Sequence, residues 1–158
     1  MNKNLGIVVS TRPDIVKMSP IIRYCTKNNI DFTLIHSGQH YDTEMDEIFF
    51  NELDIKRPDI NLRSSLEFNS DGYLDQTAVI MNKFKRAFIE ELIDFVMVLG
   101  DTNSALAASI IARRLSLKLA HVEAGLRSFD TRMQEEYNRV MIDHISDLKF
   151  APTKNAFN

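Results

Sequence analysis

Short apolar runs rich in β-branched and aromatic residues alternate with longer segments of helical periodicity along this chain. The runs are Leu5–Val9, Phe32–His36, Phe95–Leu99, Leu119–Val122 and Leu148–Ala151. Strands that alternate with helices form βαβ units, in which neighbouring strands run parallel and helices cover both faces of the sheet. The pattern therefore predicts an α/β fold built on a parallel sheet.

The intervening segments predict five helices and one long loop. The expected helices cover Pro13 to the Asn28-Asn29 pair that ends the first helix, Asp42 or Thr43 to Leu53, Leu74 to Leu92, Ala105 to Leu115, and Glu135 to Ile145. Pro13 suits the first turn of its helix, because the N–H group that it lacks would have no partner there. The stretch from Lys56 to Tyr73 lacks periodicity and is expected to be an extended loop.

Length and composition restrict the class of protein. The 158 residues correspond to one domain, and the net charge of -3 argues against nucleic acid as the main partner, since nucleic-acid binding leaves a basic footprint. The single cysteine, Cys25, excludes an internal disulfide and points to a reducing compartment. No apolar run reaches membrane-spanning length, and the first one is too short for a secretory signal. We expect a soluble, cytoplasmic protein.

Polar residues follow the predicted strands at the places where ligands usually bind. In open parallel sheets, ligands lie beyond the carboxyl ends of the strands. The polar segments there are Ser10-Thr11-Arg12, Ser37-Gly38-Gln39-His40, Gly100-Asp101-Thr102 and Glu123-Ala124-Gly125-Leu126-Arg127. Because these segments come from separate parts of the chain, their convergence on one sheet edge predicts a binding or catalytic site.

Three acidic residues are candidates for proton transfer. Glu123 and Glu135 suit a general acid and a general base if their surroundings separate their pKa values. Glu135 is equally explained as a first-turn acid that interacts with the helix dipole. Asp101 is a candidate to orient a hydroxyl group or accept a proton, and its simpler reading is a helix N-cap.

Four basic residues are candidates for binding phosphate. Arg12, Arg127 and Arg139 carry the planar guanidinium group that pairs with phosphate oxygens, and Lys17 lies about one helical turn beyond the first loop. Each of these side chains alone is more often a surface charge, but as a group beside acids they favour a functional role.

Metal and cofactor sites find little support. His36 and His40 are four residues apart, but Ser37-Gly38 between them disfavours a continuous helix, so the two imidazoles need not share a face. His121, inside a strand, is more simply a hydrogen-bonded core residue. The chain lacks both the G-x-x-x-x-G-K-[ST] and the G-x-G-x-x-G phosphate-binding loops. We expect no metal and no cofactor.

An ordered set of motifs resembles the non-hydrolysing UDP-N-acetylglucosamine 2-epimerases. The motifs are Ser10-Thr11-Arg12-Pro13, Lys17-Met18-Ser19-Pro20, Ser37-Gly38-Gln39-His40, Gly100-Asp101-Thr102, His121-Val122-Glu123-Ala124-Gly125-Leu126-Arg127, Glu135-Glu136 with Asn138-Arg139, and Phe150-Ala151-Pro152-Thr153. The resemblance implies a Rossmann-like domain in the glycosyltransferase-B arrangement of two domains, with the active site between them. Residues 1–158 would be the N-terminal domain, and the C-terminal nucleotide-binding domain is absent from this sequence.

The resemblance also implies an activity and the roles of individual residues. Such enzymes interconvert UDP-N-acetylglucosamine and UDP-N-acetylmannosamine by eliminating UDP and adding it back, without a cofactor. The implied acid–base residues are Asp101, Glu123 and Glu135, and the implied substrate-binding residues are Arg12, Lys17, Gln39, His40, Arg127 and Arg139. A homodimer is the implied assembly, and this part alone is expected to be inactive.

Three features depart from the family pattern. Ser10 stands where a glycine is usual, Gln134 where a proline is common, and the segment from Leu66 to Thr77 lacks a glycine-rich pattern. Two alternatives therefore remain open. The chain belongs to an epimerase of another UDP-2-acetamido sugar, or it is a non-catalytic module that binds a sugar nucleotide or a partner chain.

Overall fold

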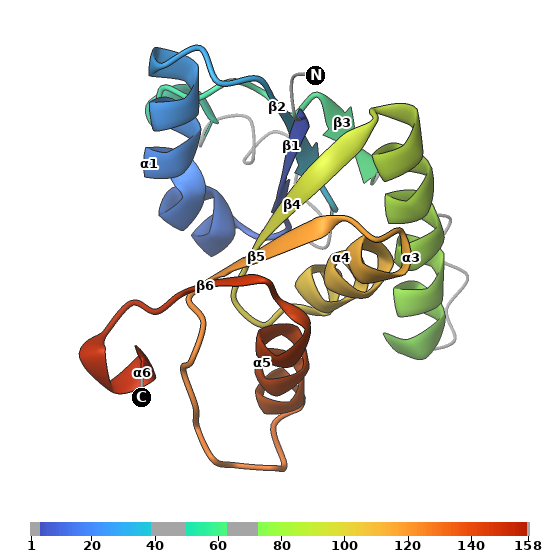
Figure 1. Cartoon of the computed structure of the whole chain (residues 1–158), viewed down its shortest axis with the longest axis vertical. Coiled ribbons are helices and arrows are strands. Elements are labelled where there is room, and N and C mark those ends of the chain that lie inside the picture. The colour runs from blue at the N-terminus through green and yellow to red at the C-terminus, as the bar shows by residue number, and fades with distance from the viewer. Residues whose placement is uncertain (1–3, 39–49, 63–72, 158) are drawn as a thin grey trace.

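A parallel six-stranded sheet forms the centre of the computed structural model, which describes residues 4–38, 50–62 and 73–157 (Figure 1). The strands are β1 (Asn4–Val9), β2 (Phe32–His36), β3 (Ile60–Asn61), β4 (Ile93–Leu99), β5 (Lys118–Val122) and β6 (Leu148–Phe150). Their spatial order is β3-β2-β1-β4-β5-β6, and every neighbouring pair is parallel. Strands β2 and β3 thus lie on one side of β1, and strands β4, β5 and β6 lie on its other side. The switch point between β1 and β4 is where ligands bind in sheets of this kind.

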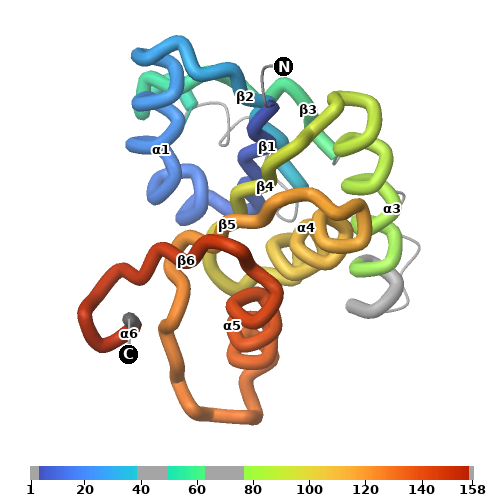
Figure 2. Tube along the Cα trace, in the orientation of Figure 1, coloured from blue at the N-terminus to red at the C-terminus, as the bar shows by residue number. Residues whose placement is uncertain are grey.

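Helices cover both faces of this sheet, as the sequence predicts. They are α1 (Arg12–Lys27), α3 (Tyr73–Glu90), α4 (Asn103–Arg114), α5 (Gln134–Ile145) and α6 (Lys154–Phe157). Figure 2 shows α1 on one side of the sheet and α3, α4 and α5 on the other, with α6 beyond β6. The helix expected from Asp42 or Thr43 lies mostly outside the described residues, and residues 50–52 are helical.

Each face has its own hydrophobic core. Ile15, Met18 and Ile22 of α1 follow helical spacing, are fully buried and pack with residues of β1 and β2 on one face. On the other face, Phe84 and Phe88 of α3 stack at 5.6 Å between ring centroids. Small buried residues of α4, namely Ala105, Ala107, Ala108, Ser109 and Ala112, let that helix approach the sheet closely. These two cores hold β1 and β4, and so the switch point, in a rigid frame.

The predicted loop from Lys56 to Tyr73 is wrong where it contains β3 and at Tyr73, which begins α3, and its residues 63–72 lie outside the described residues. Ile60 and Asn61 pair with Ile35 and His36 at the edge of the sheet. Asp59 accepts a hydrogen bond from the Leu34 N–H at 2.6 Å, and its own N–H donates to the Leu34 carbonyl at 2.9 Å. A two-residue strand carries no periodicity, so only the free edge of β2 determines its place.

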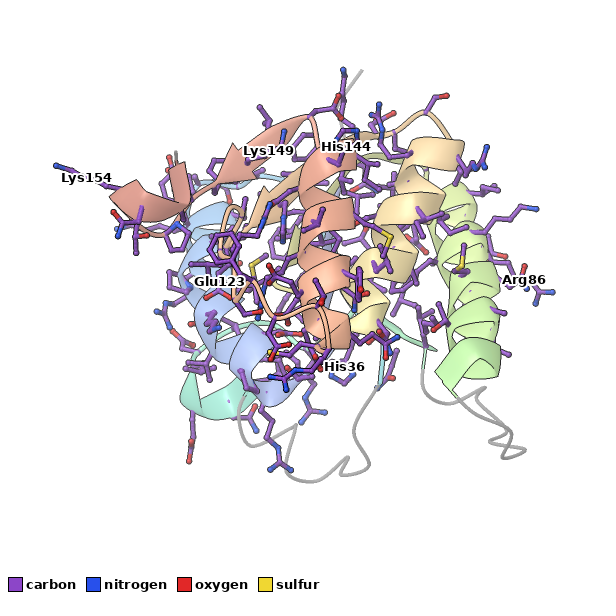
Figure 3. The ribbon with its side chains drawn as sticks, turned by 90° about the horizontal axis from the view of Figure 1, so that it is seen from below. His36, Arg86, Glu123, His144, Lys149 and Lys154 are labelled. Carbon is purple, nitrogen blue, oxygen red and sulfur yellow. The ribbon has the colours of Figure 1, made fainter. Side chains whose placement is uncertain are left out.

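The basic residues of α3 do not form a site. Lys85 and Arg86 are exposed, and Arg86 projects from the side of the molecule far from Glu123 (Figure 3). Lys83 instead donates a hydrogen bond to the Leu62 carbonyl at 2.9 Å. In the described part of the chain, no helix has the length and apolar character needed to cross a bilayer.

Candidate functional site

The carboxyl ends of β1, β4 and β5 bring the predicted polar segments together. Gly100 and Glu123, which follow β4 and β5, both have backbone φ angles of 68°. A Cβ atom on Gly100 would lie 3.7 Å from a Glu123 carboxylate oxygen, so this carboxylate lies over the turn that carries Asp101. The two loops therefore present their acids at one edge of the sheet, as the sequence predicts.

Glu123 forms an ion pair with Lys17 across the switch point. The Lys17 Nζ atom lies 2.9 Å from each carboxylate oxygen, and the Glu123 side chain is one-quarter exposed. Lys17 comes from the second turn of α1, and Glu123 lies in the space between α1 and α5 (Figure 3). A cation predicted to bind phosphate thus neutralises an acid predicted to transfer a proton.

Asp101 forms a second ion pair, with Arg139 of α5. Asn138 supports the same turn, because its amide donates to the Asp101 carbonyl at 2.8 Å and to the Asn103 side chain at 3.0 Å. The reading of Asp101 as the N-cap of α4 is wrong: Thr102 occupies that position, and its hydroxyl accepts a hydrogen bond from the Ala105 N–H. The Asp101 carboxylate is therefore directed to Arg139 instead of to the helix end.

Glu136, the neighbour of the predicted Glu135, is a buried acid of α5. Its carboxylate accepts hydrogen bonds from the Ser128 N–H and hydroxyl, from the Phe129 N–H, and from Arg139 at 3.1 Å. These donors, the Ser128 N–H foremost, hold the pKa of Glu136 at about 2, against its ordinary 4.5. Within the described part of the chain, the exposed Glu135 makes no hydrogen bond or ion pair. Its predicted acid–base role stays a prediction.

Asp143 is a second buried acid of α5, and it is not among the site residues predicted from the sequence. Its carboxylate accepts hydrogen bonds from His121 Nδ1 at 2.6 Å and from the Gly125 N–H at 3.0 Å, and it pairs with Arg127 at 2.7 Å. Burial alone would raise the pKa of Asp143, but these three donors outweigh it and bring the pKa to about 2. An acid on the inward face of a helix that also carries Glu136 and Ile142 is the signal that could have revealed it.

His121 is a core residue with both ring nitrogens bonded, as its place in a strand predicts. The side chain is fully buried, and Nε2 lies 2.8 Å from the Gly100 carbonyl oxygen. His121 thus joins the end of β5 to the turn after β4.

Ser10 joins the loop after β1 to the N-cap residue of α4. Its buried hydroxyl donates to the Asp14 carboxylate and lies 3.0 Å from the Thr102 hydroxyl. The Asp14 carboxylate also accepts the N–H groups of Ser10 and Thr11, both at 3.0 Å. The serine that departs from the family pattern is therefore fully hydrogen-bonded inside the protein.

The other predicted site residues fall into two groups. Arg12 begins α1 at the same edge and is partly buried, and Arg127 is held by Asp143. Gln39 and His40 lie outside the described residues, so their predicted roles stay predictions. His36 is buried with its ring at 6.4 Å from that of Phe50. In the residues that the structure describes, no cluster of three metal-ligating side chains is found.

A cavity of about 620 Å³ lies beside the acids and does not include Glu123 or Asp101. Its lining comes from the loop after β5, from Asp143, and from the β6–α6 region: Ala124, Gly125, Leu126, Arg127, Phe129, Asp143, Lys149, Ala151, Thr153, Asn155 and Ala156. The geometry of the ion pairs, and not this cavity, identifies the candidate site. Two carboxylates paired with two cations at a switch point suit proton transfer next to a bound diphosphate.

Comparisons with known proteins find similar sequences and structures. The family described as UDP-N-acetylglucosamine 2-epimerase matches residues 23–158. A UDP-N-acetylglucosamine 2-epimerase of Methanococcus maripaludis is 49% identical over 154 residues, which cover 98% of this chain and 40% of the relative. A UDP-2,3-diacetamido-2,3-dideoxy-D-glucuronate 2-epimerase of Pseudomonas aeruginosa is 36% identical over 152 residues, which cover 96% of this chain and 42% of the relative.

Solved structures show the same fold. The crystal structure of Methanocaldococcus jannaschii UDP-GlcNAc 2-epimerase in complex with UDP-GlcNAc and UDP has a TM-score of 0.89 and 47% identity. It covers 98% of this chain and 42% of that one. The chain thus spans about 40% of the length of the relatives that it matches.

Proposed function

The chain belongs to the UDP-N-acetylglucosamine 2-epimerase family. From that premise we propose that it is the N-terminal part of an enzyme that interconverts UDP-N-acetylglucosamine and UDP-N-acetylmannosamine. The observation that carries the proposal is the pairing of Glu123 with Lys17 and of Asp101 with Arg139 at one switch point. Proton transfer at a sugar carbon needs the acids, and a departing diphosphate needs the cations.

The reaction proceeds by elimination and addition. A carboxylate removes the proton at C2 of the sugar while the bond between C1 and the diphosphate oxygen breaks, and the electron pair leaves with UDP. The product of this step is a 2-acetamidoglucal. A proton then returns to C2 on the opposite face, and the UDP oxygen adds to C1. The two steps balance without an oxidant or a reductant.

Asp101, Glu123 and Glu135 are the acid–base residues in this proposal. Lys17 and Arg12 bind the diphosphate, and the remaining substrate-binding residues are Gln39, His40, Arg127 and Arg139. The ion pair between Lys17 and Glu123 supports an exchange on binding. A diphosphate that takes Lys17 would release the Glu123 carboxylate from its ion pair, so that it can contact the sugar.

The rest of the cleft comes from a second domain in this proposal. This chain spans only about 40% of the length of its relatives, which supports the presence of a second domain in the whole protein. We also propose that the whole protein is a homodimer and that it lies in the cytoplasm. Light scattering of the whole protein tests the homodimer. The exposed Tyr137, Leu148 and Phe150 offer apolar surface for such contacts.

A chimera tests the activity. This chain would replace the matching N-terminal 40% of the M. maripaludis relative. We expect conversion of UDP-N-acetylglucosamine to UDP-N-acetylmannosamine, with deuterium at C2 when the solvent is deuterated. Glu123→Gln and Glu135→Gln should each lower kcat by at least about 10²-fold, the scale of general acid–base groups, without unfolding the protein. Product without solvent deuterium would overturn the elimination mechanism.

The similarity to the P. aeruginosa enzyme favours one alternative, a 2-epimerase of another UDP-2-acetamido sugar. A second chimera, with the C-terminal part of that enzyme, should be offered both sugar nucleotides. Turnover of the UDP-diacetamido glucuronate alone would show that this chain belongs to a 2-epimerase of another UDP-2-acetamido sugar. A chain that folds in both chimeras and turns over neither substrate would instead be a binding module.

A further inference from the structure

We propose that Asp143 and His121 form a clamp that holds the loops of Glu123 and Asp101 at a fixed spacing. In the proposed epimerase, on which the kinetic part of this inference rests, they act as positioning residues. Neither side chain needs to touch the substrate. The clamp is a chain of hydrogen bonds that runs from α5 through the end of β5 to the turn after β4.

The Asp143 carboxylate forms hydrogen bonds on both sides of Glu123 in the sequence. One carboxylate oxygen faces His121, two residues before Glu123, and the other faces the Gly125 N–H, two residues after it. The second oxygen also pairs with Arg127. A single buried carboxylate therefore fixes both flanks of the residue that carries the proposed base.

His121 carries this restraint to the neighbouring loop. Its Nε2 faces the Gly100 carbonyl, which can only accept a hydrogen bond, and its Nδ1 faces the Asp143 carboxylate, which also accepts. His121 therefore bridges an acceptor on α5 and an acceptor in the turn after β4. Gly100 directly precedes Asp101, so the bond fixes the turn that carries the second acid.

The loop needs such a restraint because its backbone is strained. Glu123 has a φ angle of 68°, a left-handed conformation that is strained for residues other than glycine. Strained residues persist where the surrounding structure determines their position, and they concentrate at functional sites. The clamp residues are nearly excluded from water, with side chains 0% and 7% exposed, so their hydrogen bonds do not compete with solvent.

Asp147 offers a matched control at the opposite end of β5. Its carboxylate accepts the Leu119 N–H at 2.9 Å and pairs with Arg113 at 2.9 Å and with Lys118 at 3.4 Å. It thus holds a strand end by the same kinds of contact, but far from the acid-bearing loops. A purely structural role for Asp143 predicts similar behaviour of Asp143→Asn and Asp147→Asn.

Nitrogen NMR of the His121 ring in this chain tests the clamp without any assay of activity. We expect the Nδ1 chemical shift of His121 in Asp147→Asn to match that of the wild type at neutral pH. In Asp143→Asn this shift should change, because an amide group replaces the carboxylate that faces Nδ1. The Gly125 amide should exchange with solvent at least about 10-fold faster in Asp143→Asn alone. An unchanged His121 ring in Asp143→Asn would overturn the clamp.

Two substitutions of His121 separate its two bonds. The amide nitrogen of asparagine can take the place of Nδ1 and that of glutamine the place of Nε2. His121→Gln should therefore keep the amide shifts of Gly100 and Asp101, whereas His121→Asn should change them. Equal changes in both variants would contradict the link between the loops.

Kinetics of the chimera test the positioning role. We expect kcat to fall by about 10–100-fold in Asp143→Asn, the scale seen for residues that orient active-site groups, and to stay within about twofold in Asp147→Asn. Equal kcat values in the two variants would overturn the positioning role. An inactive chimera before any substitution would count against the proposed epimerase, while the NMR result would still decide the clamp.

Discussion

Neighbouring glutamates show how a single residue step separates two environments. Glu135 and Glu136 both lie in the first turn of α5, yet the first is exposed and the second is buried under the Ser128–Phe129 backbone. One step along a helix turns a side chain by about 100°. The sequence places a pair of acids at the helix start, but only the packing of α5 decides which of the two faces inward.

The pKa of Glu136 predicts a loss of stability in acid. Because its folded-state pKa is depressed to about 2 from 4.5, Glu136 contributes stability above about pH 4.5 that is lost as the pH falls toward 2. Asp143, with a folded-state pKa of about 2 against 3.8, adds to the loss over the lower part of this range. Urea denaturation of Glu136→Gln should show a smaller decrease between pH 5 and pH 2.5 than the wild type. Glu135→Gln is the control, and a wild-type profile in Glu136→Gln would contradict the assignment.

The elements with strong periodicity could be predicted from the sequence, and the elements that depend on a neighbour could not. The spacing of Ile15, Met18 and Ile22 predicts the buried face of α1, because that face is a property of the segment itself. The two residues of β3 pair only because β2 leaves a free edge and Asp59 bonds to it. In the same way, the position of Asp101 and Glu123 at one sheet edge could be predicted from strand order. The contacts of Asp143 with His121 and Gly125 depend on how α5 packs.

Two glycines at the ends of β4 and β5 predict different costs of substitution. Both have positive φ angles, so an alanine at either site is strained by about 1–2 kcal/mol. At Gly100 the added Cβ atom finds an ordinary contact, but at Gly125 it would overlap the Ala156 carbonyl of α6. Gly125→Ala should therefore lower the free energy of unfolding by clearly more than Gly100→Ala, and it should displace α6 from the loop after β5. Chemical denaturation of both variants measures this, and equal losses would contradict the packing of α6 against Gly125.

At the scale of the whole molecule, the site shows a contrast between its two sides. The carboxylates are held by many contacts within the described residues, such as those of Asp101 to Arg139 and of Glu123 to Lys17. The same ion pairs are one-fifth to one-half exposed, so one side of the site faces solvent. In the proposed reaction, water at such a surface would screen the charges and compete for the departing diphosphate.

This exposure predicts that the 158-residue chain folds alone but does not turn over UDP-N-acetylglucosamine. Two cores and a sheet held on both faces give it an independent fold, so a cooperative thermal transition should be seen by circular dichroism. Turnover needs the eliminated UDP to stay beside the glucal until it adds back, and half a cleft cannot keep the two fragments together or exclude water. Proton NMR of the sugar nucleotide should show no UDP-N-acetylmannosamine with the chain alone. Adding a separately folded C-terminal part of the M. maripaludis relative should restore conversion in proportion to the complex formed. Steady conversion by the pure chain would contradict the requirement for a second domain, and it would mean that Glu123, Asp101 and their cations suffice for the whole reaction.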